Sequence, residues 1–285
     1  MITPTKHEPL PGIRRVDKLY LELLFRCNFR CLHCYHGADL NRPERVEPEQ
    51  AVGALDYFAE HYGCAQVCFL GGEPLLYPGL PDLLAAAKQR GFHTEICTNG
   101  YRRYNVLDRC RSHLDLLRVS LDGGTAEAHD RIRRPGSFAA AFDTLTWARD
   151  RGLVFGATCT LTEDNIGTIP ALAMRLHELG ARELILHRLR TMGNAAQTSL
   201  REVTWEHTER LHVALTGMNL TGLHINREIL LPERCPASGD VVEKLEIAPD
   251  GRVYLSCAEV AGNGRDIRFD FARAALVNAT ESVTR

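Results

Sequence analysis

Short apolar stretches alternate with longer amphipathic stretches along residues 19–189 of the chain. The short stretches are rich in aliphatic and β-branched residues, which is typical of strands, whereas the long stretches repeat apolar residues at helical spacing. The pattern predicts strands at 19–25, 65–70, 93–98, 116–121, 154–161 and 183–189. It predicts helices between them at 48–62, 81–91, 103–113, 137–151 and 168–179. This alternation predicts an α/β fold with a parallel sheet and right-handed crossovers.

Six strand–helix units are too few to close an eight-stranded barrel, so we predict a partial (β/α)6 barrel. In parallel barrels, the residues that carry the chemistry gather at the C-terminal ends of the strands. A motif of cysteine, glycine or polar residues follows each of the first four predicted strands. These motifs are CNFRCLHC (27–34), GGEP (71–74), TNG (98–100) and SLDGG (120–124). We therefore expect the four motifs to belong to one site.

The alternation ends after about residue 200. A helix is predicted at 204–216, and two alternating strands are predicted within 242–257, around the turn residues Pro249, Asp250 and Gly251. Such a pair of strands predicts a small β-hairpin appendage. We therefore expect three parts, which are an N-terminal lead-in at 1–17, the partial barrel at 18–217 and a C-terminal extension at 218–285.

Net charge and cysteine content narrow the function classes. The 285 residues carry a formal net charge of −2, which favours neither nucleic acid nor an anionic membrane as a partner. No apolar run approaches the roughly 18 residues that span a bilayer, and the N-terminal residues lack the apolar segment of a signal peptide. We therefore expect a cytoplasmic protein with reduced thiols, which serve as metal ligands, catalytic groups or packing residues. The packing residues are expected to be Cys64, Cys68, Cys97, Cys110 and Cys159.

Three cysteines lie within one short loop. Cys27, Cys31 and Cys34 have the spacing C-x3-C-x2-C. A structural zinc site usually takes four ligands, and this loop offers only His33 or His36 as a fourth. A [4Fe–4S] cluster instead takes one thiolate at each iron, so three thiolates leave one iron open to bind a substrate. We favour the cluster and keep structural zinc as the alternative.

The loop CNFRCLHCY resembles the cluster loop of the radical S-adenosylmethionine (radical SAM) superfamily, and the resemblance extends over roughly residues 18–260. It implies that SAM chelates the open iron. It also implies that one electron from the reduced cluster cleaves SAM to a 5′-deoxyadenosyl radical, which removes hydrogen from a substrate carbon. An electron donor such as flavodoxin or ferredoxin is then an expected partner.

Several further residues acquire roles through this resemblance. Gly71, Gly72 and Glu73 match the family's GGE motif, in which the carboxylate receives the ammonium group of SAM. Ser120 and Asp122 match positions that hydrogen-bond the ribose hydroxyls.

The remaining implied contacts concern the adenine and the carboxylate of SAM. His33 stands beside the third cysteine, near the adenine, where the family usually has an aromatic residue. Asn165 lies where the family often has a polar contact to SAM. The carboxylate of SAM has three candidate partners that the resemblance does not separate, since arginine forks match carboxylates. They are Arg131, Arg133 and Arg134.

The C-terminal extension contains Cys235 and Cys257, and it resembles the start of the SPASM or twitch extensions of radical SAM enzymes. Those extensions bind auxiliary iron–sulfur clusters. This chain departs from them in the spacing between Gly251 and Cys257 and in having no later cysteine. Three hypotheses stay open, namely that the pair ligates an auxiliary cluster, that one thiol is catalytic and donates hydrogen to a substrate radical, or that both are structural.

The resemblance implies an enzyme that acts on a peptide or a small natural product. An epimerase or dehydrogenase of a carbohydrate-like molecule is the alternative, with a C-terminal cysteine as hydrogen donor. An iron–sulfur electron carrier or sensor is the alternative from another class, but the GGE and SLDG motifs would serve no purpose there.

Overall fold

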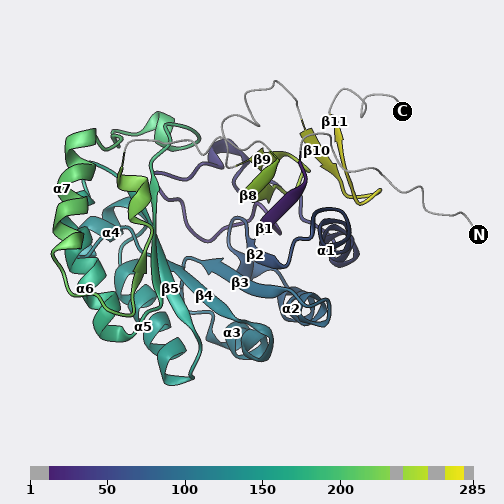
Figure 1. Cartoon of the computed structure of the whole chain (residues 1–285), viewed down its shortest axis with the longest axis horizontal. Coiled ribbons are helices and arrows are strands. Elements are labelled where there is room, and N and C mark those ends of the chain that lie inside the picture. The colour runs from purple at the N-terminus through teal and green to yellow at the C-terminus, as the bar shows by residue number, and fades with distance from the viewer. Residues whose placement is uncertain (1–12, 232–239, 256–266, 279–285) are drawn as a thin grey trace, which may run out of the picture. The chain divides into compact units, whose positions relative to one another are not determined.

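The structure is a computed structural model that describes residues 13–231, 240–255 and 267–278 (Figure 1). The chain divides into two compact units, which we describe separately. The first contains residues 13–25, 43–95 and the described residues from 240 onward. The second contains residues 26–42 and 96–231. Strand β3 (His93–Thr98) runs across the division.

The first unit is built on parallel strands with helices between them. Its strands and helices before the division are β1 (Arg15–Glu22), α1 (Pro48–Tyr62), β2 (Gln66–Leu70), the 3₁₀ helix η2 (Pro74–Leu76) and α2 (Leu80–Gln89). Its strands after residue 240 are β8 (Val241–Ile247), β9 (Val253–Leu255), β10 (Ile267–Asp270) and β11 (Ala275–Asn278). Strand β1 pairs in parallel with β2 on one side and with β8 on the other. Strands β8 and β9 form the predicted antiparallel hairpin, and Gly251 takes a φ of 84° in its turn.

Helix α1 shows why the sequence folds as predicted here. Pro48 opens the helix, and Glu47 and Gln50 form a capping box. Gly63 ends it in a left-handed conformation, which glycine adopts without a steric penalty. Its apolar residues recur at helical spacing, and Leu55 and Phe58 are fully buried.

The second unit continues the alternation of strands and helices. Its strands are β4 (Leu116–Ser120), β5 (Phe155–Leu161), β6 (Glu183–Arg188) and β7 (His224–Ile225), each parallel to the next. Its α-helices are α3 (Tyr104–Cys110), α4 (Ala126–Ile132), α5 (Ser137–Asp150), α6 (Ile169–Leu179) and α7 (Trp205–Thr216). Its 3₁₀ helices are η1 (Gly37–Asp39), η3 (Arg111–His113), η4 (Ile166–Thr168), η5 (Ala195–Gln197) and η6 (Arg227–Leu230). Figure 1 shows α5, α6 and α7 flanking the strands of this unit. Every residue of β4 is buried, as expected for a parallel strand covered on both faces.

The predicted fold class is confirmed, because the strands are mostly parallel, helices connect them and the sheet does not close. Within the described ranges, β7 pairs only with β6, and β9 pairs only with β8. Strand β1 starts at Arg15, earlier than predicted, because its charged first residues pair with β8, a contact remote in sequence. Helix α4 and the strand pair β10–β11 were not predicted. The three-part division at residues 17 and 217 stays a prediction.

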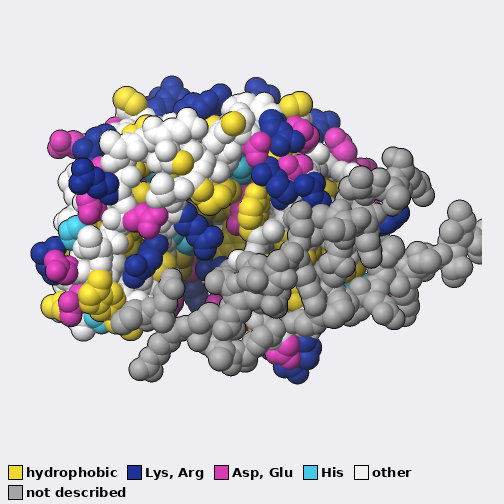
Figure 2. Space-filling view, turned by 90° about the horizontal axis from the view of Figure 1, so that it is seen from above, with side chains coloured by type: hydrophobic (Ala, Val, Ile, Leu, Met, Phe, Trp, Pro, Cys, Tyr) yellow, Lys and Arg dark blue, Asp and Glu magenta, His cyan; other side chains and the backbone are white. Residues whose placement is uncertain are grey.

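Two general expectations can be compared with the structure. Cys64, Cys68, Cys110 and Cys159 are buried, as packing residues should be, whereas Cys97 is partly exposed. Positive and negative side chains are interspersed on the face shown in Figure 2, in line with the nearly balanced charge of the chain. None of the described helices is long and apolar enough to cross a membrane.

Candidate active site

The cysteine loop lies in the second unit and carries its three thiols at different depths. Cys31 is buried, and Cys27 and Cys34 are partly exposed. The backbone N–H of Phe29 donates to Cys27 Sγ at 3.3 Å, an arrangement that stabilises negative charge on the sulfur. Asn41, in the left-handed conformation at φ 72°, accepts from the Cys27 N–H at 3.2 Å through its side-chain oxygen. The backbone N–H of Cys27 is therefore already hydrogen-bonded within this segment.

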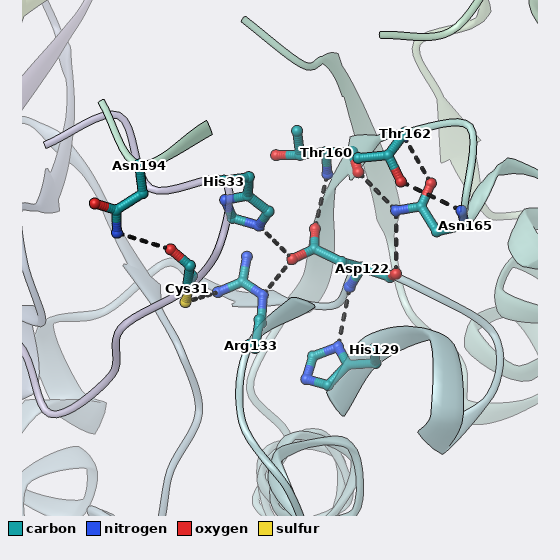
Figure 3. Close-up of polar contacts among 9 residues, drawn as sticks. All are labelled: Cys31, His33, Asp122, His129, Arg133, Thr160, Thr162, Asn165 and Asn194. Atoms are coloured by element: carbon teal, nitrogen blue, oxygen red, sulfur yellow. Dashed lines mark hydrogen bonds and ion pairs between the residues drawn. The ribbon is translucent and has the colours of Figure 1, made fainter. Parts of the chain in front are cut away.

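Asp122, two residues beyond the end of β4, is the centre of a buried polar network (Figure 3). Its Oδ1 accepts from the backbone N–H of Thr160 in β5 at 2.8 Å. Its Oδ2 lies 2.6 Å from Nε2 of His33 in the cysteine loop and also accepts from Nε of Arg133. Segments that are far apart in sequence therefore meet at one carboxylate.

The charge state of this carboxylate follows from its neighbours. Burial by itself would raise the pKa of Asp122, but the Arg133 guanidinium and His33 outweigh burial and hold that pKa well below its usual range. Asp122 is therefore ionised at neutral pH, and it forms an ion pair with Arg133, whose side chain is 9% exposed.

Arg133 also faces the buried cysteine. Its Nη1 lies 4.0 Å from Cys31 Sγ. Burial raises the pKa of the Cys31 thiol to about 11, and the Arg133 charge opposes this rise. A guanidinium next to a thiol favours the thiolate, which is the form that binds metals.

The structure separates the three arginines that the sequence left open. Arg133 is the one that contacts both Asp122 and Cys31. Arg131 forms an exposed ion pair with Asp164 at 3.2 Å. Arg134 lies over the ring of Tyr101, 4.9 Å from its centroid, in a cation–π contact.

His129 in α4 supports the same network and was not predicted. It is fully buried, and its Nδ1 accepts from the backbone N–H of Asp122 at 3.0 Å. Burial, followed by the Arg133 charge, lowers the pKa of His129 to about 4, so the ring is neutral at neutral pH. The sequence offered one signal for this residue. Thr125 is a typical N-cap residue, its side chain accepts from the Ala128 N–H, and the helix that it starts carries the pair His129 and Asp130.

Asn165 is fully buried and ties the loop after β5 to the end of β4. Its amide nitrogen donates to the carbonyl oxygens of Asp122 at 3.1 Å and Thr160 at 2.8 Å. Its amide oxygen accepts from the Thr162 N–H at 2.8 Å. The structure thus brings Asn165 to Asp122 and gives it three backbone partners within the protein, and its predicted contact with SAM stays a prediction. Ser120 ends β4 with about 9% of its surface exposed.

The GGE loop belongs to the first unit and is held mainly through its backbone. Gly71 has a φ of 132°, and a Cβ there would lie 2.6 Å from the carbonyl oxygen of Leu24. The Gly72 N–H donates to that same oxygen at 2.7 Å. Glu73 is 1% exposed, and its Oε1 accepts from the Leu75 N–H at 3.0 Å, which caps η2. Glycine is therefore required at position 71 by the close approach to Leu24.

The donor set fits an iron–sulfur cluster. The loop offers three thiols, one sulfur that accepts an N–H bond, and an adjacent guanidinium that offsets negative charge. Across residues 13–231, 240–255 and 267–278, no group of three or more His, Cys, Asp or Glu side chains is placed to hold a single metal ion. A cluster differs from a single ion in this respect, because each thiolate binds a separate iron. Cys235 and Cys257 lie outside the described residues.

Comparison with known proteins identifies the class. Residues 21–176, more than half of the chain, match the model of the Radical SAM superfamily. The chain belongs to this superfamily, and membership implies a [4Fe–4S] cluster and SAM as cofactors.

Among its relatives, the chain is 29% identical over 193 residues to Fe-coproporphyrin III synthase of Methanosarcina barkeri, covering 65% of this chain and 47% of that protein. It is 30% identical over 175 residues to mycofactocin maturase MftC of Mycobacterium tuberculosis, covering 60% of this chain and 44% of that protein. The chain therefore spans about half the length of these relatives.

Solved structures show the same fold. Streptococcus suis SuiB bound to its precursor peptide SuiA superposes with a TM-score of 0.70 at 16% identity, covering 94% of this chain and 63% of that chain. The enzyme anSMEcpe with bound AdoMet gives a TM-score of 0.64 at 15% identity, covering 84% of this chain and 71% of that chain.

Proposed function

We propose that this protein is a radical SAM enzyme that holds a [4Fe–4S] cluster on Cys27, Cys31 and Cys34 and abstracts hydrogen from a peptide or small natural product. The observation that carries the proposal is the buried network of Asp122, His33 and Arg133, because it fixes the cysteine loop against the ends of β4 and β5 and sets a guanidinium beside Cys31. An electron carrier would need no such arrangement around an open iron. The cluster and SAM, when bound, would supply reductive cleavage of the sulfonium and hydrogen-atom abstraction.

Arg133 is our candidate partner for the carboxylate of SAM. A guanidinium has five N–H donors in a planar fork, so it can bind a ligand while it remains paired with Asp122. Arg131 and Arg134 are engaged with Asp164 and Tyr101 instead. In this proposal Asp122 acts through Arg133 and His33, and its predicted contact with the ribose stays a prediction. The predicted contacts of Ser120, Asn165 and His33 with SAM stay predictions in the same way.

Glu73 is our candidate partner for the ammonium group of SAM. Its Oε1 already caps η2, but a carboxylate can accept about four hydrogen bonds, so the cap is compatible with a bound ammonium. The pairing would be charge-assisted and therefore stronger than a neutral hydrogen bond.

A peptide is the substrate class that the relatives support most broadly. SuiB was solved in complex with the precursor peptide SuiA, and AlbA of Bacillus subtilis is a biosynthesis protein of the antilisterial bacteriocin subtilosin. The Fe-coproporphyrin III synthase supports a small molecule as the second candidate. An epimerase reaction with Cys235 or Cys257 as hydrogen donor remains part of this proposal, as do a dehydrogenase reaction and an auxiliary cluster on that pair.

The test is anaerobic reconstitution followed by reduction in the presence of SAM. The parent protein should bind about four irons at this site and release 5′-deoxyadenosine. The triple variant Cys27→Ala, Cys31→Ala, Cys34→Ala should lose that activity, whereas Cys64→Ala, which removes a thiol from the first unit, should keep it. Reductive SAM cleavage by the triple variant would falsify the proposal.

The substrate is tested separately from the cofactor chemistry. The probe is a synthetic peptide with the sequence of a short reading frame beside this gene, incubated with the reconstituted enzyme, SAM and reductant. A change in peptide mass that depends on SAM supports the peptide class. Turnover of a porphyrin and no change in the peptide would favour the small-molecule class.

The C-terminal pair can be tested by its iron content. If Cys235 and Cys257 ligate an auxiliary cluster, the triple variant should retain iron that disappears when both are also changed to alanine. If one of them donates hydrogen, its alanine variant should still form 5′-deoxyadenosine but no product. Normal turnover by both single variants would leave the pair with a structural role.

A further inference from the structure

A short segment after β6 lies directly against the cysteine loop. The backbone N–H of Asn194 donates to the carbonyl oxygen of Cys34 at 2.8 Å. The side-chain nitrogen of the same residue donates to the carbonyl oxygen of Cys31 at 3.0 Å (Figure 3). One residue, 160 or more positions away in the chain, therefore binds the backbone of two of the three cysteines.

The approach of the two segments depends on glycine. A Cβ at Gly193 would lie 2.4 Å from the carbonyl oxygens of Cys34 and Tyr35, a distance that side-chain carbons do not tolerate. A Cβ at Gly37, on the opposite segment, would lie 2.8 Å from the Cα of Gly193. Both backbones can meet at this distance because neither residue has a side chain.

The segment is anchored in the core of its unit. Ala195 follows Asn194 and packs in a buried cluster with Ile132, Leu189 and Leu200. Ile132 also binds the cysteine loop, because its carbonyl oxygen accepts from the Leu32 N–H at 2.8 Å. The contacts at Asn194 and Ile132 therefore connect the loop to one packed cluster.

Asn194 does not use its side chain in the usual way for its position. It is the N-cap of η5, where asparagine commonly accepts from the backbone of the helix it starts. Here its side chain makes no such cap and donates to Cys31 instead. The N-terminus of η5 therefore lacks the side-chain cap from Asn194, and that side chain binds the cysteine loop instead.

We propose that Gly193 and Asn194 are positioning residues that hold the backbone of Cys31 and Cys34 in the conformation that binds the cluster. This inference rests on the proposed cluster site and deepens it. By holding the backbone carbonyl oxygens of Cys31 and Cys34, the pair restricts the loop before iron binds. The loop then loses less conformational entropy on binding. Partners that orient metal ligands typically change metal affinity or activity by about 10–100-fold when removed.

The experiment measures iron loss from the reconstituted protein. Excess chelator is added under anaerobic conditions, and the decay of the cluster's visible absorbance gives the rate. Asn194→Ala and Gly193→Ala should lose iron about tenfold faster than the parent or more. The controls are Asn219→Ala, an exposed asparagine, and Gly180→Ala, a helix-ending glycine at φ 84° with open space around its Cβ position. Both controls should lose iron at the parent's rate.

A second readout separates positioning from general stability. The melting temperature of the iron-free protein should be lower in both Gly193→Ala and Gly180→Ala than in the parent, because each change strains a left-handed residue. Only Gly193→Ala should also lose iron faster. If Asn194→Ala fails to fold, Asn194→Asp retains the shape and removes the donor, so it should also accelerate iron loss. Iron loss at the parent's rate in the Asn194 and Gly193 variants overturns the inference. Failure of the parent itself to bind iron overturns the proposed function instead.

Discussion

The cysteine loop and the GGE loop both follow a strand, yet they are stabilised in different ways within their own units. The cysteine loop is held by charged and amide side chains from distant segments, among them Asp122, Arg133 and Asn194. The GGE loop is held by backbone contacts, since Gly71 lies close to the carbonyl oxygen of Leu24 and the Gly72 N–H donates to that oxygen. The cysteine loop should therefore be sensitive to removal of a charge as well as to a side chain at Gly193, whereas the stability of the GGE loop should depend on the absence of a side chain at Gly71.

This difference matches what the proposed function requires of the two loops. Thiolates that bind iron carry negative charge, and burial makes such charge costly unless a positive group is near. Arg133 provides that group, and Asp122 in turn compensates Arg133. In the proposed function, the GGE loop instead brings one carboxylate to a fixed place, and a backbone turn held against Leu24 would achieve this without further charges.

The largest expected effect is that of Asp122→Asn. The change leaves the Arg133 guanidinium without its carboxylate, and breaking a buried ion pair from one side typically costs about 3–5 kcal/mol. Urea unfolding of the iron-free protein should show a loss of that size. The matched control is Asp164→Asn, whose exposed pair with Arg131 should contribute at most about 1 kcal/mol. Equal effects of the two changes would show that the buried network does not stabilise the second unit.

Gly71→Ala should have the next largest effect on stability and tests the other loop. The new Cβ would lie 2.6 Å from the Leu24 carbonyl oxygen at a residue with φ 132°, so the chain must shift. Strained backbone of this kind costs about 1–3 kcal/mol. Gly91→Ala is the control, because its φ is 80° and nothing lies within 4 Å of its Cβ position. The difference in melting temperature between the two variants measures the cost of the close approach together with that of the larger φ at Gly71, and no difference would refute that cost.

The sequence predicted those features that depend on neighbouring residues. The strands and helices of the α/β fold follow from local apolar periodicity, and the motif positions follow from the rule that sites gather at strand ends. Cys31, His33 and Asp122 were accordingly expected together, and the structure brings them together. The hairpin around Asp250 was also predicted, because its turn residues are adjacent in sequence.

The features that could not be predicted depend on distant pairing. Helix α4 has only seven residues, too few for a clear periodicity, and without it the three arginines could not be told apart. Residues two apart on a helix point to nearly opposite sides, which explains why Arg131 is exposed while the side chain of Arg133, just after the helix, is only 9% exposed. Asn194 had no signal in the sequence, because its partners are the backbone carbonyls of a loop more than 150 residues away.

Glu73→Gln sharpens the comparison by removing charge from the GGE loop while keeping its shape. The glutamine oxygen can still accept from the Leu75 N–H, so the cap on η2 should persist and the melting temperature should change little. The charge-assisted bond to an ammonium is worth about 1.5–3 kcal/mol, so SAM should bind roughly tenfold to a hundredfold more weakly to the reconstituted protein. Equilibrium dialysis with labelled SAM measures this. Glu73→Ala should add a loss of stability of about 0.5–2 kcal/mol from the missing cap. Unchanged SAM affinity in both variants would exclude Glu73 as the ammonium partner.

The smallest expected effect at neutral pH concerns His129, whose neutral ring supports Asp122. Its pKa is lowered from 6.5 to about 4, first by burial and then by Arg133, so between these pH values the unfolded chain binds a proton that the folded protein does not. The contribution of His129 to folding stability is therefore complete above about pH 6.5 and falls as the pH drops toward 4, by at most about 1.4 kcal/mol per pH unit. In His129→Gln this slope should disappear, while at pH 7 the variant loses only the hydrogen bond from the Asp122 N–H, about 0.5–1.5 kcal/mol.

Urea unfolding of the iron-free proteins at several pH values between 4 and 7 gives both quantities, with His224→Gln as the exposed control that should keep the parent's slope. A parent-like slope in His129→Gln would mean that the ring binds its proton equally in both states, and the network around Asp122 would then have to tolerate a second positive charge beside Arg133.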